Sequence, residues 1–382
     1  MERPKALSPI TIVITVEGLS TAPLGCYGSS IGETPAIDDV AARGVVFDRW
    51  TSPIDRPSGL IRHWLKSCDD PIQNDAPASL CVTDDAQLDE ADFDPIFGEV
   101  RKLDSKSGGS IAPSIERTQL ARTFFELMDH IDSDTELAWL HTATLRDSWD
   151  WIEVPLPDPD EDTEPPSEEF SDEEPEPPIE PLVLPDNADV PHLELDSEGH
   201  PDLLFSWMQR YANQAFVLDT MIDALVQFLG ERPFTMIIAG ASGFSLGDNR
   251  WIGHHAGPLR SADIRLPMIV SGTSPLRVPS VTSADQFANI IRAAIAGQSC
   301  MTPAAWSHRD EEFTPQIHTD SDRATSAITT ASWFLVSEND DPMHAKLFLK
   351  PDDLNDVNDV ARLRPNVVNQ LLAEESGDDT AD

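Results

Sequence analysis

Two of the side chains that could do chemistry stand at the ends of predicted buried strands. Glu17 directly follows the apolar, β-branched run Ile10–Val16, and His141 ends a second apolar run that begins at Leu137. Short apolar runs of this kind favour buried strands, typically parallel ones. A carboxylate oxygen at such a strand end could bind a hard cation, and a histidine could bind a small anion. A lone histidine is more often a satisfied structural group, so both interpretations of His141 stay open.

A second group of reactive side chains lies on the segment before a predicted helix. Asp55 is a carboxylate that could act as a nucleophile, or it could cap the following helix, with Pro57 in the first turn. Three hydroxyls have no evident activating base in the sequence, and two arginines beside them could hold a small anion. These residues are Thr51, Ser52 and Ser58, and Arg56 and Arg62.

The four cysteines suggest no metal or redox site. Cys26, Cys68, Cys81 and Cys300 form no C-x-x-C pair, so neither zinc nor a redox motif is indicated.

The sequence predicts an α/β fold for the elements that must position these residues. Strands are predicted at Ile10–Val16, from Val45, at 137–141, at Phe234–Ala239 and at Arg265–Ser271. Helices are predicted at Ala36–Arg43, Ser114–Ile131 and Tyr211–Leu229, where apolar residues recur at helical spacing. Residues 66–110 look irregular, like a surface excursion with weak strands. Two antiparallel strands, at 333–336 and 345–349, precede a terminal helix.

The first 58 residues carry a specific pattern of residues. After the first strand come Leu24-Gly25-Cys26-Tyr27-Gly28, then Thr34-Pro35-Ala36-Ile37-Asp38, then Ala41-Ala42-Arg43-Gly44-Val45-Val46-Phe47. This arrangement resembles the N-terminal signature of the sulfatases, within the alkaline-phosphatase-like superfamily. The resemblance extends to the C-terminal segment and implies a three-layer α/β sandwich. Its central, mostly parallel sheet is flanked by helices, and a small C-terminal antiparallel sheet and helix follow.

The resemblance implies a divalent cation, usually calcium, but the expected ligands are reduced. The family has two adjacent aspartates after the first strand, where this chain has Glu17-Gly18. After a later strand it has Asp-His/Asn-Gly, where this chain has Ala241-Ser242-Gly243. Hard cations need several charged or strongly dipolar oxygens. Glu17 and Ser242 are therefore degenerate metal positions, and we expect no bound metal there.

The family's nucleophile is also replaced. The family motif Cys/Ser-x-Pro-Ser-Arg supplies a formylglycine, and it aligns with Asp55-Arg56-Pro57-Ser58-Gly59. Asp55, at the nucleophile position, cannot become formylglycine. His254 falls where the family often carries a lysine that neutralises sulfate oxygens. With Arg56, it could bind a small anion without cleaving it.

The amino-acid composition limits the kinds of partner that the protein could bind. The chain has 382 residues, 40% of them apolar, and a net charge of −42. Such a charge argues against nucleic acid and anionic membranes as partners. We recognise neither a signal peptide nor a run long enough to span a bilayer, and so predict a soluble, cytoplasmic protein.

The predicted organisation is a sulfatase-like domain (1–300), a C-terminal subdomain (301–375) and a disordered tail (376–382). Residues 153–198 are crowded with proline, aspartate and glutamate, which predicts a disordered acidic insert.

Three hypotheses follow. The first is a catalytically degenerate sulfatase-like protein that has no cofactor and a binding, assembly or unknown role. The second is a sulfate or phosphate ester hydrolase that uses Asp55 or a nearby hydroxyl. Calcium would then be held by Glu17, Asp248, Asn249 and His254. The third is a scaffold whose acidic insert contacts a basic protein.

Overall fold

The structure is a computed structural model of the whole chain. It describes residues 8–73, 78–93, 96–105, 109–152, 182, 184–196, 199–254, 257–272, 275–298, 316–319, 321, 325–338 and 341–377.

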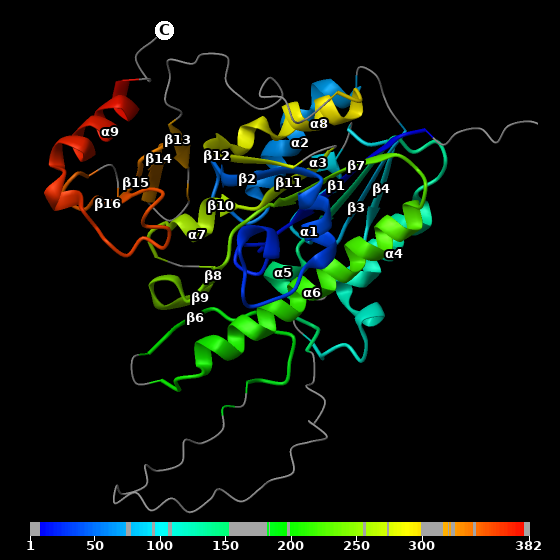
Figure 1. Cartoon of the computed structure of the whole chain (residues 1–382), viewed down its shortest axis with the longest axis horizontal. Coiled ribbons are helices and arrows are strands. Elements are labelled where there is room, and N and C mark those ends of the chain that lie inside the picture. The colour runs from blue at the N-terminus through cyan, green and yellow to red at the C-terminus, as the bar shows by residue number, and fades with distance from the viewer. Residues whose placement is uncertain are drawn as a thin grey trace, which may run out of the picture.

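A nine-stranded mixed sheet forms the centre of the molecule (Figure 1). Its strands follow the order β10-β2-β11-β7-β1-β5-β3-β4, and β12 pairs with β2. The neighbours of β1 on both sides are parallel to it, which buries β1 on both faces and explains its unbroken apolar run. The strands are β1 (Ile10–Val16), β2 (Gly44–Thr51), β3 (Ser79–Thr83), β4 (Glu99–Lys102), β5 (Leu137–Thr142), β7 (Phe234–Gly240), β10 (Arg265–Leu266), β11 (Met268–Ser271) and β12 (Leu276–Ser283).

Helices cover both faces of the sheet and give the predicted three-layer α/β fold. Helices α2 (Gly59–Gln73), α3 (Glu90–Phe93) and α8 (Phe287–Ile295) lie on one face (Figure 1). The opposite face carries α1 (Pro35–Ala42), α4 (Gln119–His130), α5 (Thr144–Asp147) and α6 (Leu203–Leu229). Among the described residues, no helix combines the length and apolar character that crossing a membrane requires.

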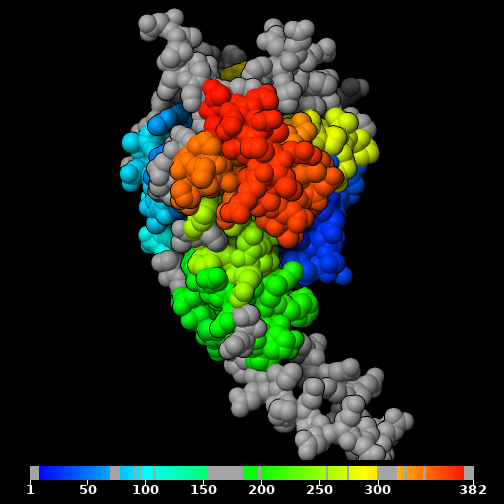
Figure 2. All heavy atoms as spheres, turned by 90° about the vertical axis from the view of Figure 1, so that its left-hand side faces the viewer, coloured from blue at the N-terminus to red at the C-terminus, as the bar shows by residue number. Residues whose placement is uncertain are grey.

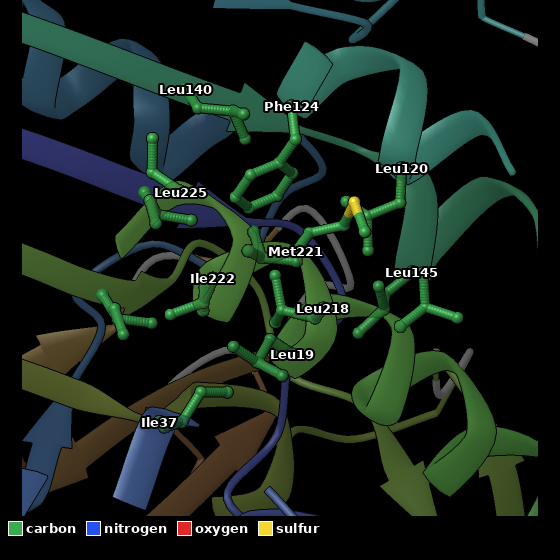
Figure 3. Close-up of a cluster of buried hydrophobic side chains, with 14 of the residues drawn as sticks. Leu19, Ile37, Leu120, Phe124, Leu140, Leu145, Leu218, Met221, Ile222 and Leu225 are labelled. Atoms are coloured by element: carbon green, nitrogen blue, oxygen red, sulfur yellow. The ribbon is translucent and has the colours of Figure 1, made fainter. Parts of the chain in front are cut away.

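The core under α6 holds this second face together. Leu218, Met221, Ile222 and Leu225 of α6 point toward Phe124 of α4 (Figure 3). Neighbours in the same cluster come from α1, β5 and α5, among them Ile37, Leu140 and Leu145. Burying each such side chain contributes about 1.5–3 kcal/mol.

A carboxylate on α6 caps α1 from outside that helix. Asp219 is 3% exposed, and its oxygens accept hydrogen bonds from Ile37 N (2.8 Å) and Ala36 N (3.2 Å). These are backbone donors of the first turn, which lack partners within the helix. Burial raises the pKa of Asp219 to about 6, although the two N–H groups favour its charged form.

This raised pKa predicts a pH-dependent stability. Between the unfolded-state value of about 3.9 and the folded value, the folded protein holds more protons, so stability falls as pH rises through that window. Asp219→Asn should remove this decrease. Urea unfolding at several pH values between about 4 and 7 measures it, with Asp129→Asn, an exposed position on α4, as the control. Identical pH slopes in the wild type and Asp219→Asn would contradict the prediction.

Two smaller sheets complete the described chain. The C-terminal one is antiparallel, in the order β13-β14-β15-β16, as predicted for 333–336 and 345–349. It packs against α9 (Pro365–Gly377) and lies over one end of the main domain (Figure 2). Its strands are β13 (Ile317–Thr319), β14 (Thr325–Thr329), β15 (Trp333–Glu338) and β16 (Lys346–Leu349). A three-stranded sheet contains β6 (Leu193–Glu194), β8 (Ser245–Leu246) and β9 (Trp251–Gly253), and a short α7 (Ser261–Ile264) follows it in the chain.

Part of the predicted acidic insert makes hydrogen bonds to the main domain. Residues 184–196 belong to the described chain, and backbone hydrogen bonds join Ala188 to Trp149 and Gly109. Arg210 of α6 also donates to the carbonyl oxygen of Pro185 (2.6 Å). Residues 153–181, the predicted boundary near residue 300 and residues 378–382 lie outside the described chain. Residues 376 and 377, predicted in the tail, end α9.

The segment 66–110, predicted to be irregular, contributes β3 and β4 to the main sheet. β3 pairs in parallel with β5 in the interior of the sheet order. This error matters for the site, because the residues that follow β3 are part of it.

Candidate functional site

Five polar side chains meet at the carboxyl edge of the parallel strands. Glu17 follows β1, Asp85 follows β3, and His141 is the next-to-last residue of β5. Ser58 precedes α2, and Arg146 lies on α5. We call these five residues the Glu17 cluster. The register pairs His141 with both Thr15 and Thr83, which sets these strand ends side by side. All five are buried: Arg146 is 6% exposed and the others 0%.

Ser58 is held by hydrogen bonds in an unusual backbone conformation. Its φ is 54°, a left-handed value that is uncommon for a residue other than glycine. Its backbone N donates to Glu17 Oε1 (3.1 Å), and its Oγ donates to Asp85 Oδ2 (2.5 Å). Arg146 Nη1 donates to the same Oγ (3.1 Å). The turn before α2 thus directs the Ser58 side chain into the site.

Asp85 is the most heavily bonded acid of the cluster. Besides Ser58, it accepts hydrogen bonds from Arg146 Nη2 (3.1 Å) and from the backbone N of Gln87 (2.8 Å). Burial alone would raise the pKa of Asp85. The hydrogen bond and charge of His141, followed by Arg146 and Ser58, outweigh burial and hold this pKa well below its usual value. Asp85 is therefore ionised in the folded protein near neutral pH.

His141 connects Asp85 to the interior of the sheet. Its Nδ1 lies 3.0 Å from Thr15 Oγ1, which also accepts from Trp139 Nε1 (2.9 Å). Its Nε2 lies 3.3 Å from Asp85 Oδ2. Because an ionised carboxylate only accepts hydrogen bonds, Nε2 carries the proton in this contact. The nitrogen that faces the site therefore offers no lone pair to a ligand.

Arg146 supplies the positive charge of the cluster. Its guanidinium lies 3.5 Å from Glu17 Oε2 and 3.1 Å from Asp85 Oδ1, and Nε contacts Asp147 Oδ1 at 2.8 Å. Burial would lower the pKa of Arg146, but Asp147, Glu17 and Asp85 together raise it. The guanidinium is thus a permanent cation fixed among three carboxylates.

The backbone at Gly18 lets α5 approach the cluster. Gly18 has φ +77°, and a Cβ added there would lie 2.9 Å from Arg146 N and 3.0 Å from Leu145 C. Its own N donates to Ser242 Oγ (2.8 Å), and its carbonyl accepts from the hydroxyl of Tyr211 on α6 (2.7 Å). A larger residue at position 18 would displace the segment that carries Arg146.

Asp84, beside the cluster, has a structural environment. Its Oδ2 lies within 3.0 Å of the hydroxyls of Thr123, Thr142 and Thr144. Its Oδ1 accepts from Ala143 N (2.8 Å). This carboxylate joins the end of β3 to α4, β5 and α5, and it positions the adjacent Asp85.

The residues singled out from the sequence divide into two groups. Glu17 and His141 lie in the cluster, and Ser242 contacts its backbone at Gly18. Asp55 contacts Ser321 Oγ (3.2 Å), and the Arg56 side chain is exposed.

Three residues of the hypothetical calcium site, Asp248, Asn249 and His254, do not belong to the Glu17 cluster. His254 packs its ring 5.6 Å from that of Phe244. Asn249 Nδ2 donates to Asn355 O of the C-terminal segment (3.2 Å), and Asp248 belongs to the same short turn. Among the described residues, Glu17, Asp85 and His141 form the group whose ligand atoms lie close enough together to share a metal ion.

Sequence reasoning missed Asp85 and Arg146 and gave Ser58 a minor place. The one available signal for Asp85 was the run Ser79–Thr83, five residues of strand type that end directly in two aspartates. No spacing in the sequence points to Arg146.

The resemblance implies a bound calcium ion, so the residues of the Glu17 cluster can be compared with the ligands that calcium needs. Glu17, Asp85 and His141 offer ligand atoms within 4.8 Å of one another. Calcium takes about 6–8 oxygen ligands, whereas this set contains two carboxylates and a nitrogen that bears a proton. The Arg146 guanidinium also lies between the two carboxylates. The residues, as they stand, do not fit calcium.

Comparisons with solved structures agree with the fold. No family model matches the chain, and no curated protein does. A structure solved in complex with its substrate D-glucosamine-2-N,6-O-disulfate superimposes with a TM-score of 0.68 at 14% identity, covering 96% of this chain and 97% of that one. The phosphonate monoester hydrolase of Agrobacterium radiobacter gives 0.67 at 13%, covering 96% and 95%. A 2-O GAG sulfatase gives 0.66 at 11%, covering 97% and 90%.

The chain therefore has the fold of these solved sulfatases and of the phosphonate monoester hydrolase. This confirms the fold that the N-terminal signature predicts. At these identities the likeness establishes the fold alone, so function has to be argued from the site.

Proposed function

We propose that this protein keeps the sulfatase-like fold without hydrolysing sulfate or phosphate esters. The observation that carries the proposal is the charge around Arg146. Glu17, Asp85 and Asp147 surround this single guanidinium, so the surroundings hold more negative than positive charge. Ester hydrolysis in such sites needs cationic groups that neutralise the oxygens of the substrate.

The electrostatic cost for an anionic substrate is large. A dianion about 4 Å from one uncompensated carboxylate is repelled by roughly 8 kcal/mol at an effective dielectric constant of about 20. Arg146 cannot offset this repulsion, because its donors already bond to Ser58, Asp85 and Asp147. The cluster is also closed to solvent, with Ser58 fully buried.

Turnover assays test the proposal. Purified protein is incubated with an aryl sulfate, an aryl phosphate and a phosphonate monoester, each with and without Ca²⁺, Mg²⁺, Mn²⁺ or Zn²⁺. We expect rates no higher than those of Ser58→Ala prepared in the same way. Metal-dependent turnover that disappears in a folded Ser58→Ala protein would refute the proposal.

One observation favours a second candidate, a metal-dependent ester hydrolase. Ser58 Oγ lies 2.5 Å from Asp85 Oδ2 at the start of α2, where a hydroxyl could transfer its proton to a carboxylate. In this alternative Ser58, not Asp55, is the nucleophile. It requires Arg146 to withdraw from Glu17 and Asp85, and the same assays distinguish it from the first candidate.

Several expectations remain predictions. These are the cytoplasmic location, the absence of nucleic acid and membrane partners, the binding of a small anion by Arg56 or His254, and a basic protein partner for the acidic insert.

A further inference from the structure

We propose that the Arg146 guanidinium serves as the built-in cation of this site and occupies the place that a divalent metal would need. The inference concerns how the cluster is neutralised, and it stands whether or not the protein hydrolyses an ester without a metal.

The guanidinium contacts the same side chains that would bind a metal. Nη1 lies 3.1 Å from Ser58 Oγ and 3.5 Å from Glu17 Oε2, and Nη2 lies 3.1 Å from Asp85 Oδ1. Glu17 Oε2 is fully buried and has no hydrogen-bond partner in the described chain. A buried carboxylate oxygen without a hydrogen bond is costly unless a positive charge lies nearby. Arg146 is the cation that the structure places beside it.

Position 18 provides independent support. The sulfatase pattern has a second aspartate here, and this chain has a glycine. A side chain at position 18 would begin 2.9 Å from the backbone N of Arg146, closer than real Cβ atoms approach other atoms. The residue that would supply a second carboxylate is therefore incompatible with the segment that supplies the guanidinium.

The hydrogen bond of His141 also fits a site that is neutralised by Arg146 and not by a metal. Its site-facing Nε2 donates toward Asp85, so it acts as a hydrogen-bond donor to a carboxylate that Arg146 already neutralises. A metal ligand would need the lone pair of this nitrogen. Removal of the guanidinium would leave an empty space between the negatively charged groups of Glu17 and Asp85, where a cation could bind. His141 could then turn a lone pair inward if its proton moved from Nε2 to Nδ1, the nitrogen beside Thr15 Oγ1.

The proposal predicts that a metal site appears when Arg146 is removed. Chelator-treated wild type, Arg146→Ala and the double variant Arg146→Ala/Glu17→Gln are titrated with Mn²⁺ by calorimetry. Arg146→Lys, which keeps the charge, is the matched control. We expect Arg146→Ala to gain one Mn²⁺ site with a dissociation constant at least about tenfold below that of any site in the wild type. That site should be missing in the double variant and in Arg146→Lys. The double variant also corrects for weak binding by the many surface carboxylates.

The outcomes that would overturn the proposal are specific. One is a stoichiometric Mn²⁺ site in the wild type that is lost on Glu17→Gln. Another is a folded Arg146→Ala protein that gains no Glu17-dependent site. If Arg146→Ala is unfolded without metal, refolding on addition of Mn²⁺ supports the proposal, and failure to refold refutes it. Ester turnover by the wild type without added metal would refute the proposed function and leave this inference untouched, whereas metal-dependent turnover that is lost on Glu17→Gln would refute both.

Discussion

Replacing Arg146 with methionine should lower the free energy of unfolding by about 3–5 kcal/mol, because it leaves two buried carboxylates without their counter-charge. Glu17 and Asp85 are both 0% exposed, and the Arg146 guanidinium lies 3.5 Å and 3.1 Å from their oxygens. Methionine preserves much of the apolar stem, so the loss reports on charge more than on packing.

Urea unfolding at fixed ionic strength measures the effect, since a chain of net charge −42 responds strongly to salt. Arg62→Met is the matched control. Arg62 also pairs with an aspartate, Asp92, but its side chain is 36% exposed, and the change should cost less than about 1 kcal/mol. The triple variant Arg146→Met/Glu17→Gln/Asp85→Asn should recover most of the loss. Equal losses in Arg146→Met and Arg62→Met would show that the cluster does not depend on its guanidinium.

The sequence predicted the parts of this fold whose signals are local. The strand Ile10–Val16 has the bounds of β1, because a strand buried on both faces shows as an unbroken apolar run. The helix Tyr211–Leu229 lies within α6, whose buried positions recur at helical spacing. The pattern from Leu24 to Phe47 was specific enough to imply the whole architecture.

The site was only partly predictable, because its residues come from segments with no shared local pattern. Ser58 and Arg146 are 88 residues apart, and Arg146 and Asp85 are 61 apart. Aligning Pro57-Ser58 with a motif gave the order of residues but not the left-handed backbone at Ser58 that turns this side chain inward. The alignment placed Asp55 at the nucleophile position, whereas Ser58 is the residue of this segment that bonds to Glu17 and Asp85.

Asp85 was missed because its strand is short. β3 has five residues in a segment otherwise rich in polar residues, and its burial depends on pairing with β5 and β4. Strand preference reflects such tertiary context more than intrinsic tendency. For residues 184–196, composition gave no sign of the backbone hydrogen bonds that join Ala188 to Trp149 and Gly109.

Replacing Asp84 with alanine should lower the free energy of unfolding by about 3–4 kcal/mol, because it removes the acceptor for several buried donors at once. Asp84 is 1% exposed. The hydroxyls of Thr123, Thr142 and Thr144 and the backbone N of Ala143 all lie within 3.0 Å of its carboxylate. Asp84→Asn keeps one acceptor oxygen and should cost about half as much.

The comparison of these two variants separates hydrogen bonding from simple loss of volume. Asp39→Ala is the surface control, because Asp39 pairs with Arg43 with its side chain 64% exposed, and it should change stability by less than about 1 kcal/mol. Since Asp84 precedes Asp85 and bonds to the segment that carries Arg146, Asp84→Ala should also loosen the Glu17 cluster. Faster hydrogen exchange at the backbone amides of Ser58 and Gly18 would reveal this. Unchanged exchange together with a full loss of stability would show that Asp84 supports the sheet and not the site.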